Sequence, residues 1–176
     1  VFIVPRFDTQ DPILKEWSIK LDVPFLCVEN VNSAEFISAL SNYSAELFVS
    51  MSFNQILKKE IIDLAHKGFI NCHAGALPFY RGRNPLNWVL INGEDHFGVT
   101  VHYVDEGIDT GDIIEQKLFP ICGSDDYKSL LSRATTECAE VLFDALIKIK
   151  NDENSVMHQK DIHPVGSYFG MRKPGD

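Results

Sequence analysis

Asn71 and His73 are the first residues whose types and spacing could support catalysis, because they lie two positions apart at the end of a short apolar run. Residues two apart on a strand point to the same side, so the amide and the imidazole can converge on one small volume. An imidazole can take or give a proton, and an amide can stabilise an oxyanion. An Asn or a His at the end of a strand also commonly makes no more than a hydrogen bond to a loop, and these two residues alone favour that simpler interpretation.

A second polar segment, residues 104–112, carries four acidic side chains separated by glycines. It lacks the ligand spacing and the terminal Glu of an EF-hand loop, which argues against a calcium site. Apolar runs flank the segment on both sides, so we expect at least one of its carboxylates to point inward. A carboxylate beside His73 would fix the tautomer of the imidazole and raise its basicity.

A third segment, residues 76–85, is a loop interrupted by Pro and Gly that runs into a helix. Pro85 suits the first turn of that helix, and Asn84 suits its N-cap. Arg81 and Arg83 beside a helix N-terminus could bind a phosphate. The alternative is a solvated loop whose arginines pair with surface acids, and the segment alone does not decide between the two.

No Ser or Cys nucleophile stands in a G-x-S-x-G setting, and Cys72 points away from the side that Asn71 and His73 share. This pattern favours direct transfer over a covalent intermediate. The residues by themselves therefore predict a site for acyl or one-carbon transfer built from an Asn, a His and an acid. They do not name the group that is transferred.

Apolar runs of strand length alternate with helix-like spacing from the first residue to Cys72, which is typical of a parallel α/β sheet. Ligands of such sheets bind beyond the carboxyl ends of the strands, so the loop after Cys72 lies where a ligand should bind. The expected strands are residues 1–4, 23–28, 47–51, 69–72, 98–104 and 113–118, and the expected helices are residues 12–21, 33–40, 54–68, 85–91 and 125–150. A polar tail follows from Asn151 onward.

The overall composition is that of a globular protein large enough to bury a core, with 176 residues, 45% of them hydrophobic and 23% charged. No apolar run is long enough to span a membrane, and Arg6 and Asp8 interrupt the short run near the start, so no signal peptide is expected. The cysteines form no C-x-x-C pair and are expected to be small buried hydrophobes in a reducing, cytoplasmic compartment. They are Cys27, Cys72, Cys122 and Cys138.

The formal net charge of -9 disfavours a polyanionic partner such as tRNA. Arg81 and Arg83 form one small basic spot, which suffices for a phosphate or two but not for a duplex. The charge balance therefore predicts a small-molecule substrate and no nucleic acid.

Three blocks of sequence, in this order, resemble the tetrahydrofolate-dependent formyltransferases: residues 71–82 (NCHAGALPFYRG), 98–102 (GVTVH) and 105–112 (DEGIDTGD). That family contains methionyl-tRNA formyltransferase, glycinamide ribonucleotide transformylase and the sugar-nucleotide N-formyltransferases. The resemblance implies a Rossmann-like α/β fold with a mostly parallel central sheet flanked by helices. It also implies a catalytic domain at residues 1–150 that lacks its first strand–helix unit, and a C-terminal extension at residues 151–176.

The catalytic residues of the family are an Asn, a His two positions further on, and an Asp in an L/I-D-x-G element. They correspond to Asn71, His73 and Asp109. The resemblance implies N10-formyltetrahydrofolate as the formyl donor and no metal. The donor would lie against the backbone of two segments and contact Met51, Ser52, Phe53, Asn54, Gln55, Leu57, Val104, Asp105 and Gly107.

Within the family, residues 81–88 (RGRNPLNW), 91–94 (INGE) and 168–174 (YFGMRKP) are most similar to the sugar-nucleotide N-formyltransferases. These enzymes formylate the free amine of a nucleotide-linked dideoxy amino sugar, commonly carried on dTDP, which is a precursor of bacterial surface polysaccharide such as lipopolysaccharide. A homodimer is implied by this branch alone. The implied acceptor-binding residues are Tyr80, Arg81, Gly82, Arg83, Asn84 and Trp88.

Several other functions stay open at this point. They are formylation of methionyl-tRNA, a purine-pathway transformylation, hydrolysis of formyltetrahydrofolate with water as the acceptor, and folate binding without turnover. A metal-dependent hydrolase that uses His73, His102 and the nearby acids fits the sequence poorly.

Overall fold

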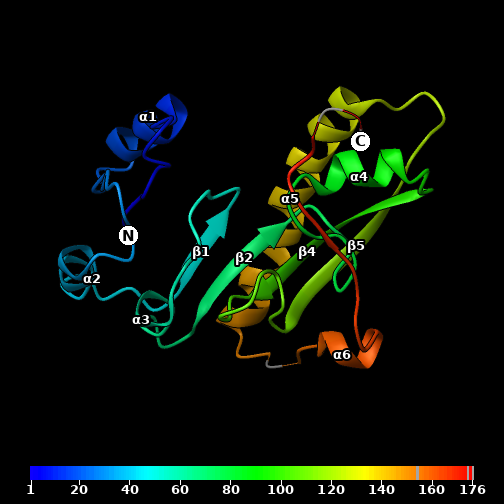
Figure 1. The fold of residues 1–176 in the computed structure, drawn as a ribbon. Coiled ribbons are helices and arrows are strands. Elements are labelled where there is room, and N and C mark those ends of the chain that lie inside the picture. Colours follow the sequence, from blue (N-terminus) through cyan, green and yellow to red (C-terminus); the bar gives the residue numbers. More distant parts are fainter. Residues whose placement is uncertain (154, 174, 176) are drawn as a thin grey trace. The chain divides into compact units, whose positions relative to one another are not determined.

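The computed structural model describes residues 1–153, 155–173 and 175, which form two compact units (Figure 1). The first unit is Val1–Phe48 with Ser52–Gly68, and the second is Val49–Met51 with Phe69–Asp176. Within the expected C-terminal extension and its tail motif, Asn154, Pro174 and Asp176 lie outside the described residues.

Two helices with side-chain caps form much of the first unit. Asp11 precedes α1 (Pro12–Lys20), and its carboxylate accepts hydrogen bonds from two backbone N–H groups of the first turn. Ser33 precedes α2 (Ala34–Leu40) and accepts one in the same way. Both helices therefore begin where a polar side chain can bind the free N–H groups of a helix start.

The first two strands expected from the sequence, residues 1–4 and 23–28, meet at a single parallel bridge between Ile3 and Phe25. Two backbone hydrogen bonds of 2.9 Å hold this bridge. The pairing is parallel, as expected, but it is shorter than the apolar runs suggested.

The helix expected over residues 54–68 is wrong for most of its length, because α3 covers only Lys59–Ile62. A side chain from a neighbouring loop holds the preceding backbone out of the helical conformation. The Asn32 amide accepts from Lys58 N–H (2.8 Å) and donates to Ile56 O (2.9 Å). Bonds of this kind compete with the backbone bonds of a helix, and Lys58 is extended.

The second unit is built on a four-stranded sheet in the order β1-β2-β4-β5. The strands are β1 (Phe48–Met51), β2 (Phe69–His73), β4 (His96–Tyr103) and β5 (Ile113–Pro120). The expected α/β class, with a central sheet flanked by helices, is confirmed.

The strand directions differ from the mostly parallel arrangement expected, because β2 pairs with β4 and β4 pairs with β5 in antiparallel fashion. The chain connects β4 to β5 through residues 104–112 alone, and a parallel crossover needs about a dozen residues or more. The chain therefore reverses at the acidic segment, which lies beside the ends of two neighbouring strands.

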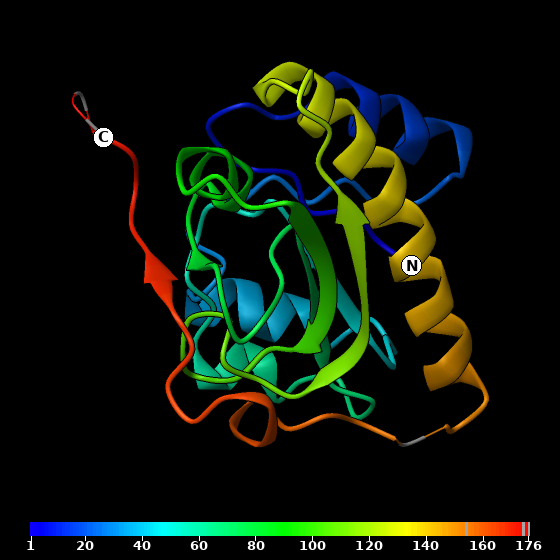
Figure 2. The same ribbon diagram turned by 90° about the vertical axis from the view of Figure 1, so that its right-hand side faces the viewer.

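The helix α5 (Tyr127–Lys150) covers one face of this sheet and contacts β2, β4 and β5 (Figure 2). Asp126 and Ser129 form a capping box at its start. Nearly all of β4 is buried, so the core of the second unit lies between β4 and α5. The buried residues of α5 recur every three or four positions and form one apolar stripe: Leu130, Ala134, Cys138, Val141 and Ala145.

The polar tail is folded onto the second unit. It contains α6 (Gln159–Ile162) and β6 (Tyr168–Phe169), and β6 pairs in parallel with β3 (Arg81–Gly82). The next helix, α4 (Pro85–Ile91), has the bounds that the sequence predicts. Figure 2 shows the tail, in red, on the side of this unit opposite α5.

Within the described ranges, no helix combines the length and the apolarity that crossing a membrane requires. The four cysteines are free thiols. Cys72 and Cys138 are buried as expected, whereas Cys27 and Cys122 are exposed, so the expectation of burial is wrong for those two.

Gly98 of β4 lies against the loop that follows β2, and a side chain at this position has no room. A Cβ on Gly98 would lie 2.6 Å from Ala76 Cβ and 2.7 Å from Ala76 Cα. We expect Gly98→Ala to lower the free energy of unfolding by about 1–3 kcal/mol, the usual cost of overpacking. Urea denaturation followed by circular dichroism measures this change.

Gly123→Ala is the matched control, because a Cβ at Gly123 meets no atom within 4 Å. We expect no loss of stability in this variant, since Ala also restricts the unfolded chain. An equal loss in both variants would contradict the packing argument.

Candidate active site

The candidate site lies on the neighbouring strands β2 and β4. Their register puts Asn71 opposite His102 and His73 opposite Thr100. Residues directly opposite each other on antiparallel strands share a face of the sheet, so these four side chains belong to one face. Cys72 faces the other way, and its thiol contacts the backbone of α5. The expectation that Asn71 and His73 share a side is therefore confirmed.

The amide of Asn71 is held at both ends. Ser50 Oγ donates to Asn71 Oδ1 (2.7 Å), and Asn71 Nδ2 lies 3.3 Å from His102 Nε2. His102 Nδ1 lies 2.7 Å from Tyr103 O, so Nδ1 donates to that carbonyl and Nε2 faces the Asn71 amide. The amide nitrogen has two N–H groups, so the second one can donate to an oxygen of a ligand.

The buried ring of His73 is fixed by a main-chain carbonyl. His73 Nε2 lies 2.7 Å from Tyr80 O, so Nε2 carries the proton and Nδ1 is the nitrogen that can accept one. Nδ1 lies 3.7 Å from Asp109 Oδ2. Gly75 leaves room for the ring, since a Cβ there would lie 2.5 Å from His73 Nε2. Burial lowers the pKa of His73 and outweighs the opposite effect of Asp109, so the imidazole is neutral at neutral pH.

Asp109 is the acid of the 104–112 segment that points inward. Its Oδ2 accepts from Gly82 N–H (2.8 Å), and its Oδ1 lies 3.5 Å from His102 Nε2. Burial by itself raises the pKa of Asp109, but the contacts with His102, His73 and Gly82 outweigh burial and lower the pKa to about 2. The carboxylate is therefore ionised at neutral pH and can stabilise an imidazolium at His73.

The neighbouring acids Asp105 and Asp112 bind partners other than His73. Asp105 Oδ1 accepts from Gly107 N–H (3.0 Å) and from Thr110 Oγ1 (2.5 Å). Asp112 Oδ1 lies 2.8 Å from His158 Nδ1 near the surface. Of these acids, Asp109 is the one placed beside His73.

The residues predicted to bind the formyl donor fall in both units. Met51, Val104, Asp105 and Gly107 belong to the second unit, whereas Ser52, Phe53, Asn54, Gln55 and Leu57 belong to the first. The Gln55 side chain is used within the first unit, where it donates to Glu29 O and accepts from Val31 N–H. Contact of these residues with a formyl donor stays a prediction.

Two of the predicted acceptor residues, Tyr80 and Trp88, stack on an aromatic ring of the tail. The ring of Phe169 lies 5.0 Å from Tyr80 and 5.1 Å from Trp88, measured between centroids. The Tyr80 hydroxyl donates to Glu94 and accepts from Asn92 Nδ2 (3.1 Å). Burial and the Glu94 carboxylate raise the pKa of Tyr80 to about 12, so this hydroxyl stays protonated.

Arg81 and Arg83, expected together at a phosphate site, have different surroundings. Arg81 Nε and Nη2 donate to Gln159 Oε1 (3.0 and 2.7 Å), and Arg81 Nη1 donates to Val165 O (3.1 Å). Arg83 is exposed, and in the described part of the chain its guanidinium makes no ion pair. Arg83 is thus available to a ligand, while Arg81 is bound to the tail.

The backbone is left-handed at two positions of the same loop. Gly82 has φ +95°, and a Cβ there would lie 2.2 Å from Phe169 O, so glycine alone fits. Asn84 stands at the N-cap position of α4, as predicted, with φ 55°. Its side chain makes no capping hydrogen bond, which differs from the predicted cap.

Three further residues contact the site: Ser50 and Gln159, which are absent from the sequence-based prediction, and His102, whose side chain enters that prediction only as part of a metal-dependent hydrolase. Ser50 and His102 both bind Asn71, and their positions follow from the strand register once β1, β2 and β4 are known to be neighbours. Gln159 contacts Asp109 across 50 positions of the chain. No local sequence pattern points to such a pairing.

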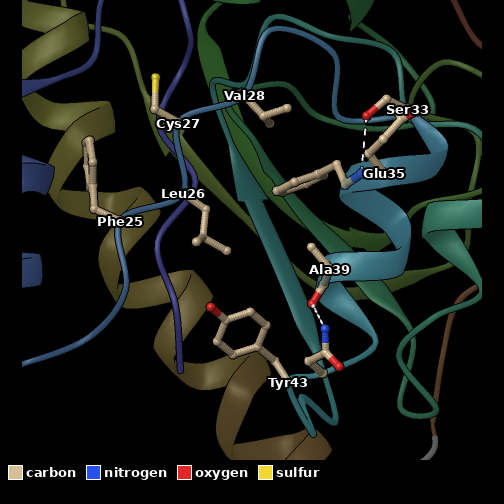
Figure 3. Close-up of a pocket in the computed structure, with 10 residues that line it drawn as sticks. Phe25, Leu26, Cys27, Val28, Ser33, Glu35, Ala39 and Tyr43 are labelled. Atoms are coloured by element: carbon tan, nitrogen blue, oxygen red, sulfur yellow. Dashed lines mark hydrogen bonds between the residues drawn. The ribbon is translucent and has the colours of Figure 1, made fainter.

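A separate cavity of about 780 Å³ lies within the first unit, between residues 25–28 and α2 (Figure 3). Two of its polar side chains bind the ends of α2: Ser33 Oγ accepts from Phe36 N–H in the first turn, and Asn42 Nδ2 donates to Ala39 O in the last turn. Glu35 is the one carboxylate in its wall. The cavity therefore lacks the paired acid and base of the second unit. No cluster of His, Cys, Asp and Glu suited to a metal ion occurs among the residues described.

Residues 22–146 match the protein family described as Formyl transferase. The chain is 36% identical over 150 residues to the methionyl-tRNA formyltransferase of Pelobacter propionicus, a match that covers 85% of this chain and 47% of that protein. The chain spans about half the length of the curated relatives it matches.

Solved structures of sugar N-formyltransferases are also similar. The enzyme from Shewanella sp. FDAARGOS_354 is 27% identical with a TM-score of 0.72, over 87% of this chain and 58% of that one. The N-formyltransferase from Helicobacter canadensis, in complex with folinic acid and dTDP-3-aminofucose, is 26% identical with a TM-score of 0.69, over 89% and 54% of the two chains. The two kinds of relative share formyl transfer and differ in the acceptor.

The contact between Asp109 and His73 makes a testable prediction about titration. The charge of Asp109 raises the pKa of His73, which burial lowers. In Asp109→Asn that charge is removed, so we expect the His73 imidazole to titrate at a lower pH than in the wild type. Histidine NMR spectra recorded against pH measure the change.

Asp105→Asn is the control for this titration, because Asp105 is exposed and bonds within its own turn. Its His73 titration should match that of the wild type. An unchanged or raised pKa of His73 in Asp109→Asn would contradict the placement of the two side chains.

Proposed function

Because the chain belongs to the formyl transferase family, we propose that it transfers a formyl group from N10-formyltetrahydrofolate to the amine of a nucleotide-linked amino sugar. One observation carries the proposal: the ionised carboxylate of Asp109 lies 3.7 Å from the neutral, buried imidazole of His73. The fixed amide of Asn71 lies on the same face of the sheet. Together these groups supply a proton acceptor, a counter-charge and an oxyanion donor, as acyl transfer between two nitrogens requires.

His73 is the base in this mechanism. Its Nδ1 accepts a proton from the amine nitrogen as the bond between that nitrogen and the formyl carbon forms. Asp109 stabilises the resulting imidazolium, since its pKa of about 2 keeps it ionised. His73 returns the proton to N10 of the donor when the bond between N10 and the formyl carbon breaks, so the protons balance over the cycle.

Asn71 stabilises the oxygen of the formyl group while the formyl carbon is tetrahedral. One amide N–H bonds to His102 Nε2, which leaves the other for the oxyanion. Ser50 and His102 hold the amide in place before the substrates bind. A donor that is already oriented needs little reorganisation during the reaction, and such donors contribute strongly to rate.

An amino sugar on a nucleotide is the acceptor that the chain's own features favour. A net charge of -9 repels a polyanion such as tRNA at long range. The partly exposed ring of Trp88 offers an aromatic surface, and the exposed Arg83 offers one charge to a phosphate. We assign these residues and the rest of the β3 loop to the acceptor. The two sugar N-formyltransferases with similar structures support this assignment.

Methionyl-tRNA is the second candidate acceptor. It is favoured by the curated relatives, which are methionyl-tRNA formyltransferases at 36% and 38% identity. The same Asn71, His73 and Asp109 chemistry would serve the amine of that substrate.

We also propose that the protein works in the cytoplasm as a homodimer. Its four free cysteines agree with a reducing compartment. The homodimer rests on the resemblance to the sugar branch, and light scattering coupled to size-exclusion chromatography tests it.

The acceptor is tested by incubating the protein with N10-formyltetrahydrofolate and, in parallel, dTDP-amino sugars, UDP-amino sugars, methionyl-tRNA or no acceptor. Mass spectrometry detects the formylated product, and absorbance follows consumption of the donor. A formylated nucleotide sugar supports the proposal, whereas formylated methionyl-tRNA identifies methionyl-tRNA as the acceptor instead. Donor consumption without an acceptor indicates hydrolysis, and no consumption in any reaction overturns catalysis by this chain.

Removing the imidazole of His73 or the amide of Asn71 should abolish most turnover. We expect His73→Ala and Asn71→Ala each to lower kcat by about 10²–10³-fold, which is the usual cost of losing one such group and equals about 2.7–4 kcal/mol. Steady-state kinetics measure the loss, and circular dichroism verifies that the variants are folded.

His96→Ala is the matched control for His73→Ala. His96 is an exposed residue at the start of β4 that contacts Asp95. We expect its turnover to stay within about twofold of the wild type, as for an ordinary surface substitution. Wild-type turnover in His73→Ala would refute the role of the imidazole.

A further inference from the structure

Three consecutive residues of the tail bind the acidic loop that carries Asp109 and the first residue of β5, which follows it. Met157 exchanges two backbone hydrogen bonds with Ile113, with N–O distances of 2.8 and 2.9 Å. The next side chain, His158, lies 2.8 Å from Asp112 Oδ1. Gln159 is the third residue, and it lies at the start of α6 with 3% of its surface exposed. The loop is therefore fixed by a segment far from it in sequence.

The amide of Gln159 uses all of its hydrogen-bonding capacity. Its Nε2 donates to Asp109 O (2.9 Å) and to Gly111 O (2.7 Å). Its Oε1 accepts twice from the guanidinium of Arg81, at 3.0 and 2.7 Å. A flipped amide would face carbonyls with its oxygen and N–H groups with its nitrogen, so the partners define one orientation.

Asp109 depends on such external support because its backbone is left-handed, with φ +53°. This conformation is sparsely populated by residues other than glycine and persists where its surroundings hold it. Gln159 holds the main chain of Asp109, and Gly82 N–H holds its carboxylate. Arg81, which precedes Gly82, is bound by the same Gln159 amide. One side chain thus fixes both the acid and the strand that contacts it.

We infer that Gln159 is a positioning residue for formyl transfer: it sets the distance between the Asp109 carboxylate and the His73 imidazole. The expected loss of turnover rests on the proposed function, whereas the effect on the distance between Asp109 and His73 does not. Gln159 lies beyond residues 22–146, the part of the chain that matches the family. The site is therefore completed by the tail.

The nearby ion pair of His158 and Asp112 does not account for the fixed position of the acidic loop. The two side chains are 63% and 41% exposed. Exposed pairs of this kind contribute little to stability and are screened by salt. The buried amide of Gln159, with four short contacts, is the stronger constraint on the loop.

Two substitutions separate the contacts of Gln159. Gln159→Met keeps a similar length and removes all four hydrogen bonds, whereas Gln159→Glu keeps an acceptor for Arg81 and loses the two donors to the loop. We expect both variants to lower kcat by about ten- to a hundredfold, the scale of a small misplacement of a catalytic group, with KM for donor and acceptor nearly unchanged. A loss confined to Gln159→Met, or a rise in acceptor KM alone, would assign the effect to Arg81 and overturn the inference.

A pH readout distinguishes positioning from a merely structural role. A looser Asp109 raises the pKa of His73 less, so the acid limb of kcat/KM should move to lower pH in Gln159→Met, which adds no charge, in the direction expected for Asp109→Asn. Gln116→Met is the matched control, because Gln116 also donates two hydrogen bonds, to Leu77 O and Thr100 Oγ1, both at 2.8 Å. It should lower the melting temperature without moving the acid limb.

NMR titration of the His73 imidazole gives the same information without turnover. A lower pKa of His73 in Gln159→Met, with no change in Gln116→Met, supports the inference even if the wild type transfers no formyl group. A wild type without activity therefore defeats the proposed function and leaves the role of Gln159 testable. An unchanged His73 titration in Gln159→Met overturns that role.

Discussion

The antiparallel register between β2 and β4 places His102 directly across from Asn71 and Thr100 across from His73. Because residues opposite each other share a face, a shift of one position would turn the amide and the imidazole toward α5 and bring Cys72 to the site. The register is defined by the buried residues on the other face of the same strands, which pack against α5. The hydrophobic core thus decides which side of the sheet carries the chemistry.

The polar groups on that face are satisfied by one another before any substrate arrives. Asn71 bonds to Ser50 and His102, and His73 bonds to a backbone carbonyl. Asp109 receives the Gly82 N–H and lies between the two histidines. Among the described residues no buried side-chain nitrogen or oxygen lacks a partner. A buried network with every member bonded is rigid, so it holds the neutral imidazole of His73 and the ionised carboxylate of Asp109 at a short distance.

Much of this arrangement could be predicted from short-range patterns. Alternation along β2 placed Asn71 and His73 on one side, apolar spacing located α2 and α5, and Pro85 located the start of α4. The prediction failed where partners distant in sequence decide the conformation. The Asn32 side chain holds the backbone ahead of α3 extended, so the expected long helix is absent. The length of the β4–β5 connection, rather than the alternation of elements, determined the strand direction there.

The pairing of β3 with β6 also determines which part of the protein can fold last during synthesis. Tyr80 N–H bonds to Ser167 Oγ across 87 positions, so the loop beside the site finds its partner only after the sheet and α5 have been synthesised. Ribosomes add about 5–20 residues per second, and domains generally fold from the N-terminal side during synthesis. A nascent chain can therefore bury its core while Asp109 still lacks the Gln159 amide. Gln159 lies nine positions beyond the end of α5, so at this rate the emerging chain can have its sheet and α5 about 0.5–2 seconds before it has a complete site.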